Sequence, residues 1–199
     1  MLSDLPAQGW RSGLRIYAHP RVLGMLFLGF SAGLPFLLVF STLSAWLAQS
    51  GISRTTIGYF SWVGLTYSLK FFWSPVVDRL PLPGLTRVLG RRRSWMLLAQ
   101  CGIAAGLAGM ALNDPSQHLM PTVAFAILVA FSSATQDIAL DAYRIEAAAL
   151  DLQGGMAAAY QMGYRIALIV AGAGALTIAS HASWHASYLT MAAFMLVGI

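Results

Sequence analysis

Charged residues are scarce in this sequence. Asp, Glu, Lys and Arg make up 10% of the 199 residues, whereas hydrophobic residues make up 58%. An average soluble domain carries roughly 25% charged residues. Several apolar runs are also longer than the roughly 18 residues that separate a membrane span from a buried helix. The shortage of charge excludes an ordinary water-soluble domain and predicts an all-α, polytopic membrane protein.

Cysteine and metal-ligand patterns are nearly absent as well. The sequence has one cysteine, Cys101, so no disulfide can form within the chain. The four histidines lie near expected span ends or in loops, and no His or Cys cluster has metal-ligand spacing. No H-E-x-x-H motif is present either, which argues against an intramembrane enzyme. We therefore expect no metal, no cofactor and no catalytic site.

Six apolar runs are expected to form the spans. They cover residues 22–47, 56–76, 94–112, 119–142, 156–179 and 187 to the end. We expect a cytoplasmic segment over residues 1–21 and a transmembrane bundle over residues 22–199. The last run reaches the end of the sequence without a polar flank, so we expect the chain to be a fragment of a longer protein.

Most arginines lie on one side of the expected bundle. They are Arg11, Arg15, Arg21, Arg79, Arg87, Arg91, Arg92, Arg93 and Arg144. Only Arg54 falls in a connection on the other side. The positive-inside rule then predicts that the N-terminus and the arginine-rich loop face the cytoplasm. This topology also explains the net charge of +5 without a nucleic-acid partner.

Four charged residues lie within the apolar runs: Lys70, Asp137, Asp141 and Arg165. A charge at the bilayer centre costs about 2.5 to 3.5 kcal/mol on insertion scales, so each of them requires an explanation. The two cations balance the two anions. Pairing within a central cavity would account for all four.

The two carboxylates of the fourth run share one helical stripe with Arg144. Asp137, beside Gln136, is expected to face a cavity, where it takes up a proton or meets a substrate cation. Asp141, one turn nearer the cytoplasm, has two interpretations. It either belongs to that carboxylate pair or forms a structural ion pair with Arg144.

The two cations also have alternatives. Lys70, which shares a face with Tyr67, either snorkels to the interface or faces Asp137 or an anionic substrate. Arg165 lies about ten residues into the fifth run, close to mid-membrane, with Gln161 one turn earlier and Tyr164 on an adjacent stripe. Its guanidinium either binds a substrate carboxylate or phosphate, or is the counter-ion of Asp137.

Small residues and a proline mark the first run. Gly33 and Pro35 in "GFSAGLP" permit close helix contact and loosen the backbone hydrogen-bond ladder, as a moving bundle requires. The alternative for any one glycine is plain helix packing.

The connection between the second and third runs resembles the loop signature of the major facilitator superfamily. "SPVVDR" and "GRRR" supply Asp78, Arg79, Gly90, Arg91 and Arg92. The sequence departs from the signature by a serine in place of the usual glycine and by the insertion "LPLPGLTRVL". We still expect that Asp78 can meet a helix N-terminus and that the arginines can meet a carboxylate.

A narrower resemblance is carried by five segments in order: "GFSAGLP", "STLSAWL", "TTIGYFSWVGLTYSLKFFWSPVVDR", "GRRRSW" and "ATQDIALDAYR". Together they are similar to the AmpG family of muropeptide permeases. The acetyl-CoA transporter family has similar stretches and is the nearest competitor. The resemblance implies a six-helix bundle of the major facilitator type, the N-terminal half of a transporter with at least twelve helices.

The same resemblance implies a function. Such a protein imports anhydro-muropeptides across the bacterial inner membrane for peptidoglycan recycling, driven by the proton gradient and by alternating access. Its partners would be the muropeptide, protons, the lipid bilayer and the missing C-terminal half. We expect substrate contacts from Gln136, Gln161, Tyr164, Arg165, Lys70 and Tyr67, and proton coupling by Asp137 and Asp141. A sensor or scaffold that does not transport is the alternative from another class.

Overall fold

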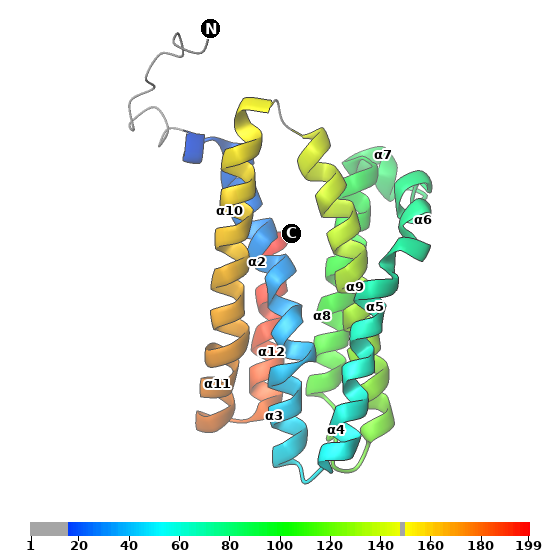
Figure 1. Ribbon diagram of the computed structural model, residues 1–199, viewed down its shortest axis with the longest axis vertical. Helices are drawn as coiled ribbons and strands as arrows, with labels where there is room; N and C mark the ends of the chain where they lie inside the picture. Colours follow the sequence, from blue (N-terminus) through cyan, green and yellow to red (C-terminus); the bar gives the residue numbers. More distant parts are fainter. Residues whose placement is uncertain (1–15, 148–149) are drawn as a thin grey trace, which may run out of the picture.

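The computed structural model describes residues 16–147 and 150–199 of the chain. Within those residues all regular secondary structure is helical. The helices lie side by side along the long axis of the molecule (Figure 1). Of the expected cytoplasmic segment over residues 1–21, the first fifteen residues lie outside the described part.

In the described part of the chain, four helical stretches are long and apolar enough to cross a membrane. They are Pro20–Gln49, formed by α2 (Pro20–Val39) and α3 (Ser41–Gln49); α8 (Arg91–Ala111); α9 (Leu119–Glu146); and Leu152–His181, formed by α10 (Leu150–Ile169), the π-helical η3 (Val170–Gly174) and α11 (Ala175–His181). They contain or overlap the first, third, fourth and fifth expected runs, and those four predictions are confirmed.

The second and sixth expected runs are helical but divided into short pieces. The second contains α4 (Arg54–Phe60), η1 (Ser61–Gly64), α5 (Leu65–Ser68), η2 (Leu69–Phe72) and α6 (Ser74–Arg79). The sixth contains α12 (Trp184–Phe194) and η4 (Met195–Gly198). Pro75, at the first turn of α6, has no backbone N–H and separates α6 from the turns before it. Neither run therefore forms one continuous long α-helix.

Glycines bring α2 and α10 into close contact. A Cβ atom at Gly163 would collide with the backbone of Leu26 and Phe30. On α2, Gly29 and Gly33 face the backbone of Tyr160 and Tyr164 in the same way. Small residues four apart allow two helix backbones to approach in a membrane, where dispersion contacts replace the hydrophobic effect. The expected role of Gly33 in close helix contact is thus confirmed.

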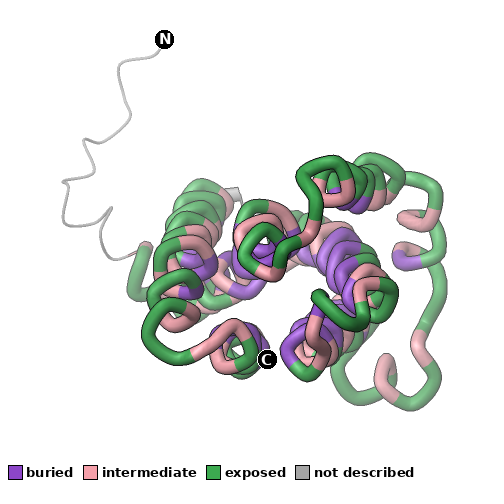
Figure 2. The backbone as a smooth tube through the Cα atoms, turned by 90° about the horizontal axis from the view of Figure 1, so that it is seen from below, coloured by how far each residue is buried: buried purple, intermediate pink, exposed green. Residues whose placement is uncertain are grey.

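A second glycine seam joins α8 and α9. Gly102 lies against Ser132, Gly106 against Val129, and Gly109 against the ring of Phe125. Buried residues from the helices face one another across the interior of the bundle (Figure 2). The two seams hold two helix pairs, α2 with α10 and α8 with α9.

Two interruptions lie next to each other in the lower half of the bundle, above α3 and α11 (Figure 1). The first helix contains Pro35 and breaks at Phe40, where ψ is −93°. The fifth stretch contains the π-helical turn η3. Two buried hydroxyl groups bond the carbonyls at these breaks: Thr42 donates to Ala171 at 2.8 Å and Tyr188 donates to Leu38 at 2.8 Å. Helix interruptions in lipid are tolerated where such partners are available.

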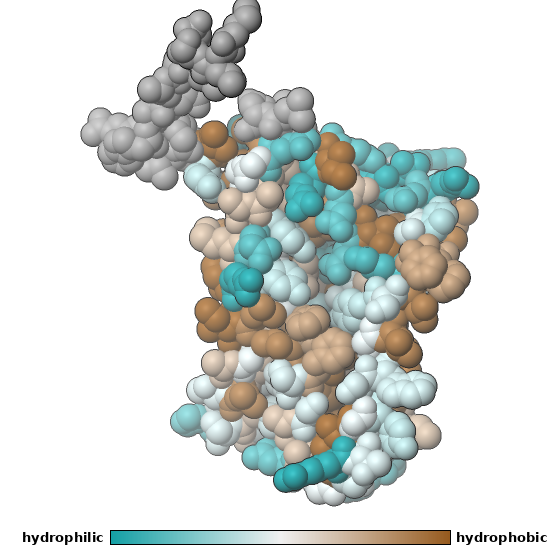
Figure 3. Space-filling view, in the orientation of Figure 1, coloured by the Kyte–Doolittle hydropathy of each residue, from teal (hydrophilic) through white to brown (hydrophobic). Residues whose placement is uncertain are grey.

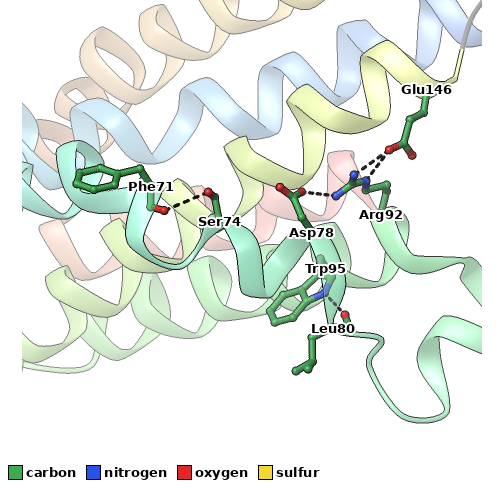
Figure 4. Close-up of polar contacts among 7 residues, drawn as sticks. All are labelled: Phe71, Ser74, Asp78, Leu80, Arg92, Trp95 and Glu146. Atoms are coloured by element: carbon green, nitrogen blue, oxygen red, sulfur yellow. Dashed lines mark hydrogen bonds and ion pairs between the residues drawn. The ribbon is translucent and has the colours of Figure 1, made fainter.

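An arginine ties three helix ends together at the upper end (Figure 4). Arg92, at the start of α8, donates to Asp78 of α6 at 2.6 Å and to Glu146 of α9 at 2.8 Å. The two carboxylates are about half exposed, at 45% and 53%, so solvent screens each pair and limits it to roughly 0.2 to 1 kcal/mol. The prediction that this arginine cluster meets a carboxylate is confirmed.

The inserted segment forms a small helix of its own. α7 (Leu85–Leu89) is flanked by Gly84 and Gly90, whose φ angles of 78° and 80° favour glycine. Asp78 bonds the Arg92 side chain, and the described structure shows no bond from it to a helix N-terminal N–H. The expected contact of Asp78 with a helix N-terminus is therefore not formed. Arg79 and Arg91 are exposed.

Charge is divided between the two ends of the bundle as the sequence predicted. The described arginines of the N-terminal region, the second connection and the α9 terminus lie at the upper end, where Arg21 also donates to the Ala147 carbonyl at 2.7 Å. Arg54 begins α4 at the lower end. There, two hydrogen bonds from Ser116 hold the pKa of the Asp114 carboxyl below its usual value.

The α2–α10 seam predicts opposite outcomes for two glycine substitutions. Gly163→Ala should destabilise the protein by about 1 to 3 kcal/mol, because the two backbones must separate. Gly24→Ala lies on α2 with no atom within 4 Å of the new Cβ, and it should be neutral or stabilising by up to about 1 kcal/mol through helix propensity. Thermal unfolding in detergent measures both. Equal melting temperatures for the two variants would contradict the seam.

Candidate functional site

Three of the four charged residues within the apolar runs, Lys70, Asp137 and Asp141, lie where three helical stretches meet. The cluster comprises Tyr67 and Lys70 from α5 and η2, Asp137 and Asp141 from α9, and Tyr160 and Tyr164 from α10. We call these six residues the central cluster. Five of the six were expected at the site, and the structure brings those five together.

Asp137 is the focus of the central cluster. Its carboxylate is partly buried, and among the charged groups around it Lys70 acts on it most strongly, followed by Asp141. The Lys70 ammonium is not within ion-pair distance in the described structure, so the attraction is medium-range. This position favours the interpretation of Lys70 as a cation facing Asp137 over a side chain that snorkels to the interface.

Asp141 makes the structural ion pair that was one of its two interpretations. Arg144 lies 3.8 Å from it, one helical turn later, and the Asp141 side chain is 55% exposed. The Arg144 guanidinium also lies over the Tyr160 ring, 5.9 Å from its centroid, which is within cation–π range. Asp141 nevertheless acts electrostatically on Asp137, so it belongs to both arrangements.

Arg165 lies outside the central cluster. Its side chain is exposed on α10, as is that of Gln161 one turn earlier. The expected ion pair between Arg165 and Asp137 is not formed among the described residues. The reason is helical geometry: Tyr164 turns toward α9, and the next residue points about 100° away around the helix axis. The charges of Asp137 and Arg165 both act on Tyr164.

The helix that carries Arg165 is the least enclosed of the four spans. Within its most apolar stretch 22% of the residues are buried, against at least 50% in the other three. A guanidinium at this depth is costly against acyl chains, so its exposed face requires water or protein. In Figure 3 hydrophilic residues cover the upper end and continue down the middle of the drawn face, between hydrophobic flanks.

Gln136 points into the core instead of toward the central cluster. Its side chain is fully buried, and its Nε2 donates to the Ser31 hydroxyl at 2.9 Å. Gln100 of α8 donates to the same hydroxyl at 3.1 Å and to the Gly198 carbonyl at 3.0 Å. The expected substrate contact of Gln136 is therefore not supported. The Gln136 amide joins α9 to α2, and Gln100 joins α8 to the same hydroxyl. Gln136 faces this core because it is turned about 100° from Asp137 around α9.

Sequence reasoning missed this buried network, although two signals were present. Gln100 is a lone amide within an apolar run, and Ser31 is the central residue of "GFSAG". The segment "GFSAG" matches the G-x-S-x-G pattern of serine hydrolases. In those enzymes the serine occupies a sharp turn between a strand and a helix. Here Ser31 lies inside α2 and accepts two amide hydrogen bonds, so the segment is a packing motif.

Comparison with known proteins places this arrangement among transporters. A family model described as acetyl-coenzyme A transporter 1 matches residues 22–118. The anhydromuropeptide permease of Escherichia coli is 39% identical over 184 residues, which are 92% of this chain and 37% of the permease. A Rickettsia conorii transporter named AmpG 4 is 37% identical over 185 residues, 92% of this chain and 44% of that protein.

The chain spans less than half the length of these relatives. Its four long apolar helices and the matched permeases make it a multi-pass membrane protein, and the resemblance drawn from the sequence is confirmed. Its helical content and length fit one half of such a transporter. The chain belongs to the AmpG family of transporters, and it corresponds to 37–44% of the length of the relatives above.

Proposed function

We propose that this chain forms the N-terminal half of a proton-coupled importer of anhydro-muropeptides in the bacterial inner membrane. The substrate class is suggested by the name of the Escherichia coli relative. The observation that carries the coupling mechanism is that Lys70 acts electrostatically, at medium range, on a partly buried Asp137 within the membrane. The N-terminus and the arginine-rich end face the cytoplasm in this proposal.

The Lys70–Asp137 arrangement offers a simple means of coupling. While Asp137 is ionised, its field holds the Lys70 ammonium. When Asp137 takes up a proton it loses its charge, and Lys70 becomes free to bind a carboxylate of the substrate. Proton and substrate then bind together, as symport requires, and they leave together when the cavity opens to the other side.

Arg165 and Gln161 supply a second contact region in this scheme. Both are exposed on α10, beside Tyr164 of the central cluster. A muropeptide carries carboxylates and sugar hydroxyls, which suit a guanidinium and an amide. Alternating access follows if this half rocks against a second half around the site, as in transporters built from repeated bundles. Asp141 then modulates the site through its charge and its ion pair with Arg144.

A second candidate substrate is acetyl-CoA. The family model that matches residues 22–118 is described as an acetyl-coenzyme A transporter. The phosphates of acetyl-CoA and the carboxylates of a muropeptide would both suit Lys70 and Arg165. The two candidates differ in their carbohydrate: the muropeptide carries an amino-sugar disaccharide, whereas acetyl-CoA carries a phosphorylated ribose joined to adenine.

Asp137→Asn tests the coupling mechanism in the full-length protein. The amide cannot titrate, so uptake into proteoliposomes should no longer respond to an imposed pH gradient, with a loss of at least about tenfold. Asp114→Asn, in the exposed turn after α8, is the matched control and should transport normally. Gradient-driven uptake by Asp137→Asn at the normal rate would disprove the assignment. Binding without accumulation by the unmodified protein would favour a sensor or scaffold.

Competition during uptake identifies the substrate. Excess unlabelled anhydro-muropeptide should abolish accumulation of labelled anhydro-muropeptide, whereas the same concentration of acetyl-CoA should leave it nearly unchanged. The reverse pattern, with acetyl-CoA accumulated and muropeptide without effect, would assign the protein to the acetyl-CoA carriers.

A further inference from the structure

The hydroxyl of Tyr67 is a buried polar group without a hydrogen-bond partner in the described structure. A donor that is removed from water and left unpaired is costly, and native proteins rarely keep one without a use. Ser133 of α9 lies near this hydroxyl but outside hydrogen-bond geometry. The group is thus directed at α9 and is free to donate.

The Tyr67 ring is held in place by aromatic packing. Its centroid lies 6.3 Å from that of Phe36 and 6.0 Å from that of Phe40, both on the first helix. The Phe40 ring in turn packs on Gly64, where an added Cβ would lie 3.3 Å from ring atoms. Since the ring is fixed between two helices, the direction of the hydroxyl is fixed as well.

The charged group of α9 that acts on the Tyr67 hydroxyl is Asp137. Ser133 and Asp137 are four residues apart on α9, so they lie one above the other on the same face. Asp137 acts electrostatically on the Tyr67 hydroxyl, as does Tyr164. A shift of the second span by about one helical turn along α9, roughly 6 Å, would bring the hydroxyl from Ser133 to the carboxylate.

We infer that Tyr67 is a positioning residue that donates a hydrogen bond to the ionised Asp137 carboxylate in one conformation and releases it in another. This inference rests on the proposed role of Asp137 in proton coupling. The bond stabilises the charged carboxylate, so its loss during the conformational change favours proton uptake. Tyr67 thereby links the position of the second span to the protonation of Asp137.

Other charged and titratable groups surround Asp137 and contribute to its response to pH. They come from the second span, α9 and α10. Lys70, Asp141, Tyr160 and Tyr164 interact with Asp137 directly, whereas Arg144 and Arg165 act on the two tyrosines. The contribution of Tyr67 differs from theirs because it depends on one hydroxyl, which a tyrosine-to-phenylalanine change removes without altering the ring.

Tyr67→Phe in the full-length transporter tests the inference. The pH of half-maximal uptake should move to a more alkaline value by about one unit, a tenfold change in proton concentration, because one hydrogen bond to the charged form is lost. Tyr59→Phe is the matched control, since Tyr59 is 66% exposed on the same span, and its pH profile should be unchanged. If uptake by the Tyr67→Phe protein is too slow to measure, the pH dependence of muropeptide binding in detergent gives the same midpoint.

Two outcomes separate this inference from the proposed function. If Tyr67→Phe lowers uptake at every pH without moving the midpoint, Tyr67 has only a structural role and the inference is wrong. If Asp137→Asn retains normal proton coupling, the proposed function fails, whatever Tyr67→Phe does. A shift in Tyr67→Phe together with loss of coupling in Asp137→Asn supports both.

Discussion

A charged or polar group inside a bilayer must find a partner within the protein or water in a cavity. This constraint organises the molecule. It explains why Lys70 and Asp137 lie near each other on different helices, and why Tyr188 and Thr42 bond carbonyls at the two helix interruptions. It also explains why the exposed face of α10, which carries Arg165, cannot be a lipid face along its whole length.

The bundle combines stiff and deformable parts. The glycine seams hold α2 against α10 and α8 against α9 at backbone contact, so each pair is expected to move as a unit. The second span is different, because it is divided by 3₁₀ turns and buries few of its residues, Phe60, Val63 and Val77. At the upper end Arg92 joins this span to α8 and α9 through exposed ion pairs, which are weak enough to exchange. A transporter of this kind would change shape chiefly through that span.

Much of this arrangement could be predicted from the sequence. The long apolar runs predict the four long spans, and the distribution of arginines predicts which end of the bundle is charged. Both predictions succeed because they depend on composition averaged over many residues. The proximity of Lys70 to Asp137 followed from the cost of leaving either charge alone, although the described structure has no ion pair between them. The directions of Gln136 and Arg165 could not be predicted. Each is one position from a residue of the central cluster, and 100° around a helix decides between core, cavity and lipid.

The central claim is that the Arg165 face of α10 borders water within the membrane. Labelling of single cysteines by a membrane-impermeant maleimide tests it most directly, in protein whose only cysteine, Cys101, has been replaced by alanine. Arg165→Cys should react, and excess muropeptide should slow the reaction. Phe27→Cys is the control: it is 50% exposed but lines a groove of apolar side chains, so it should not react. If Arg165→Cys is as unreactive as Phe27→Cys, the face meets lipid or is covered by protein, and the account of the site is wrong.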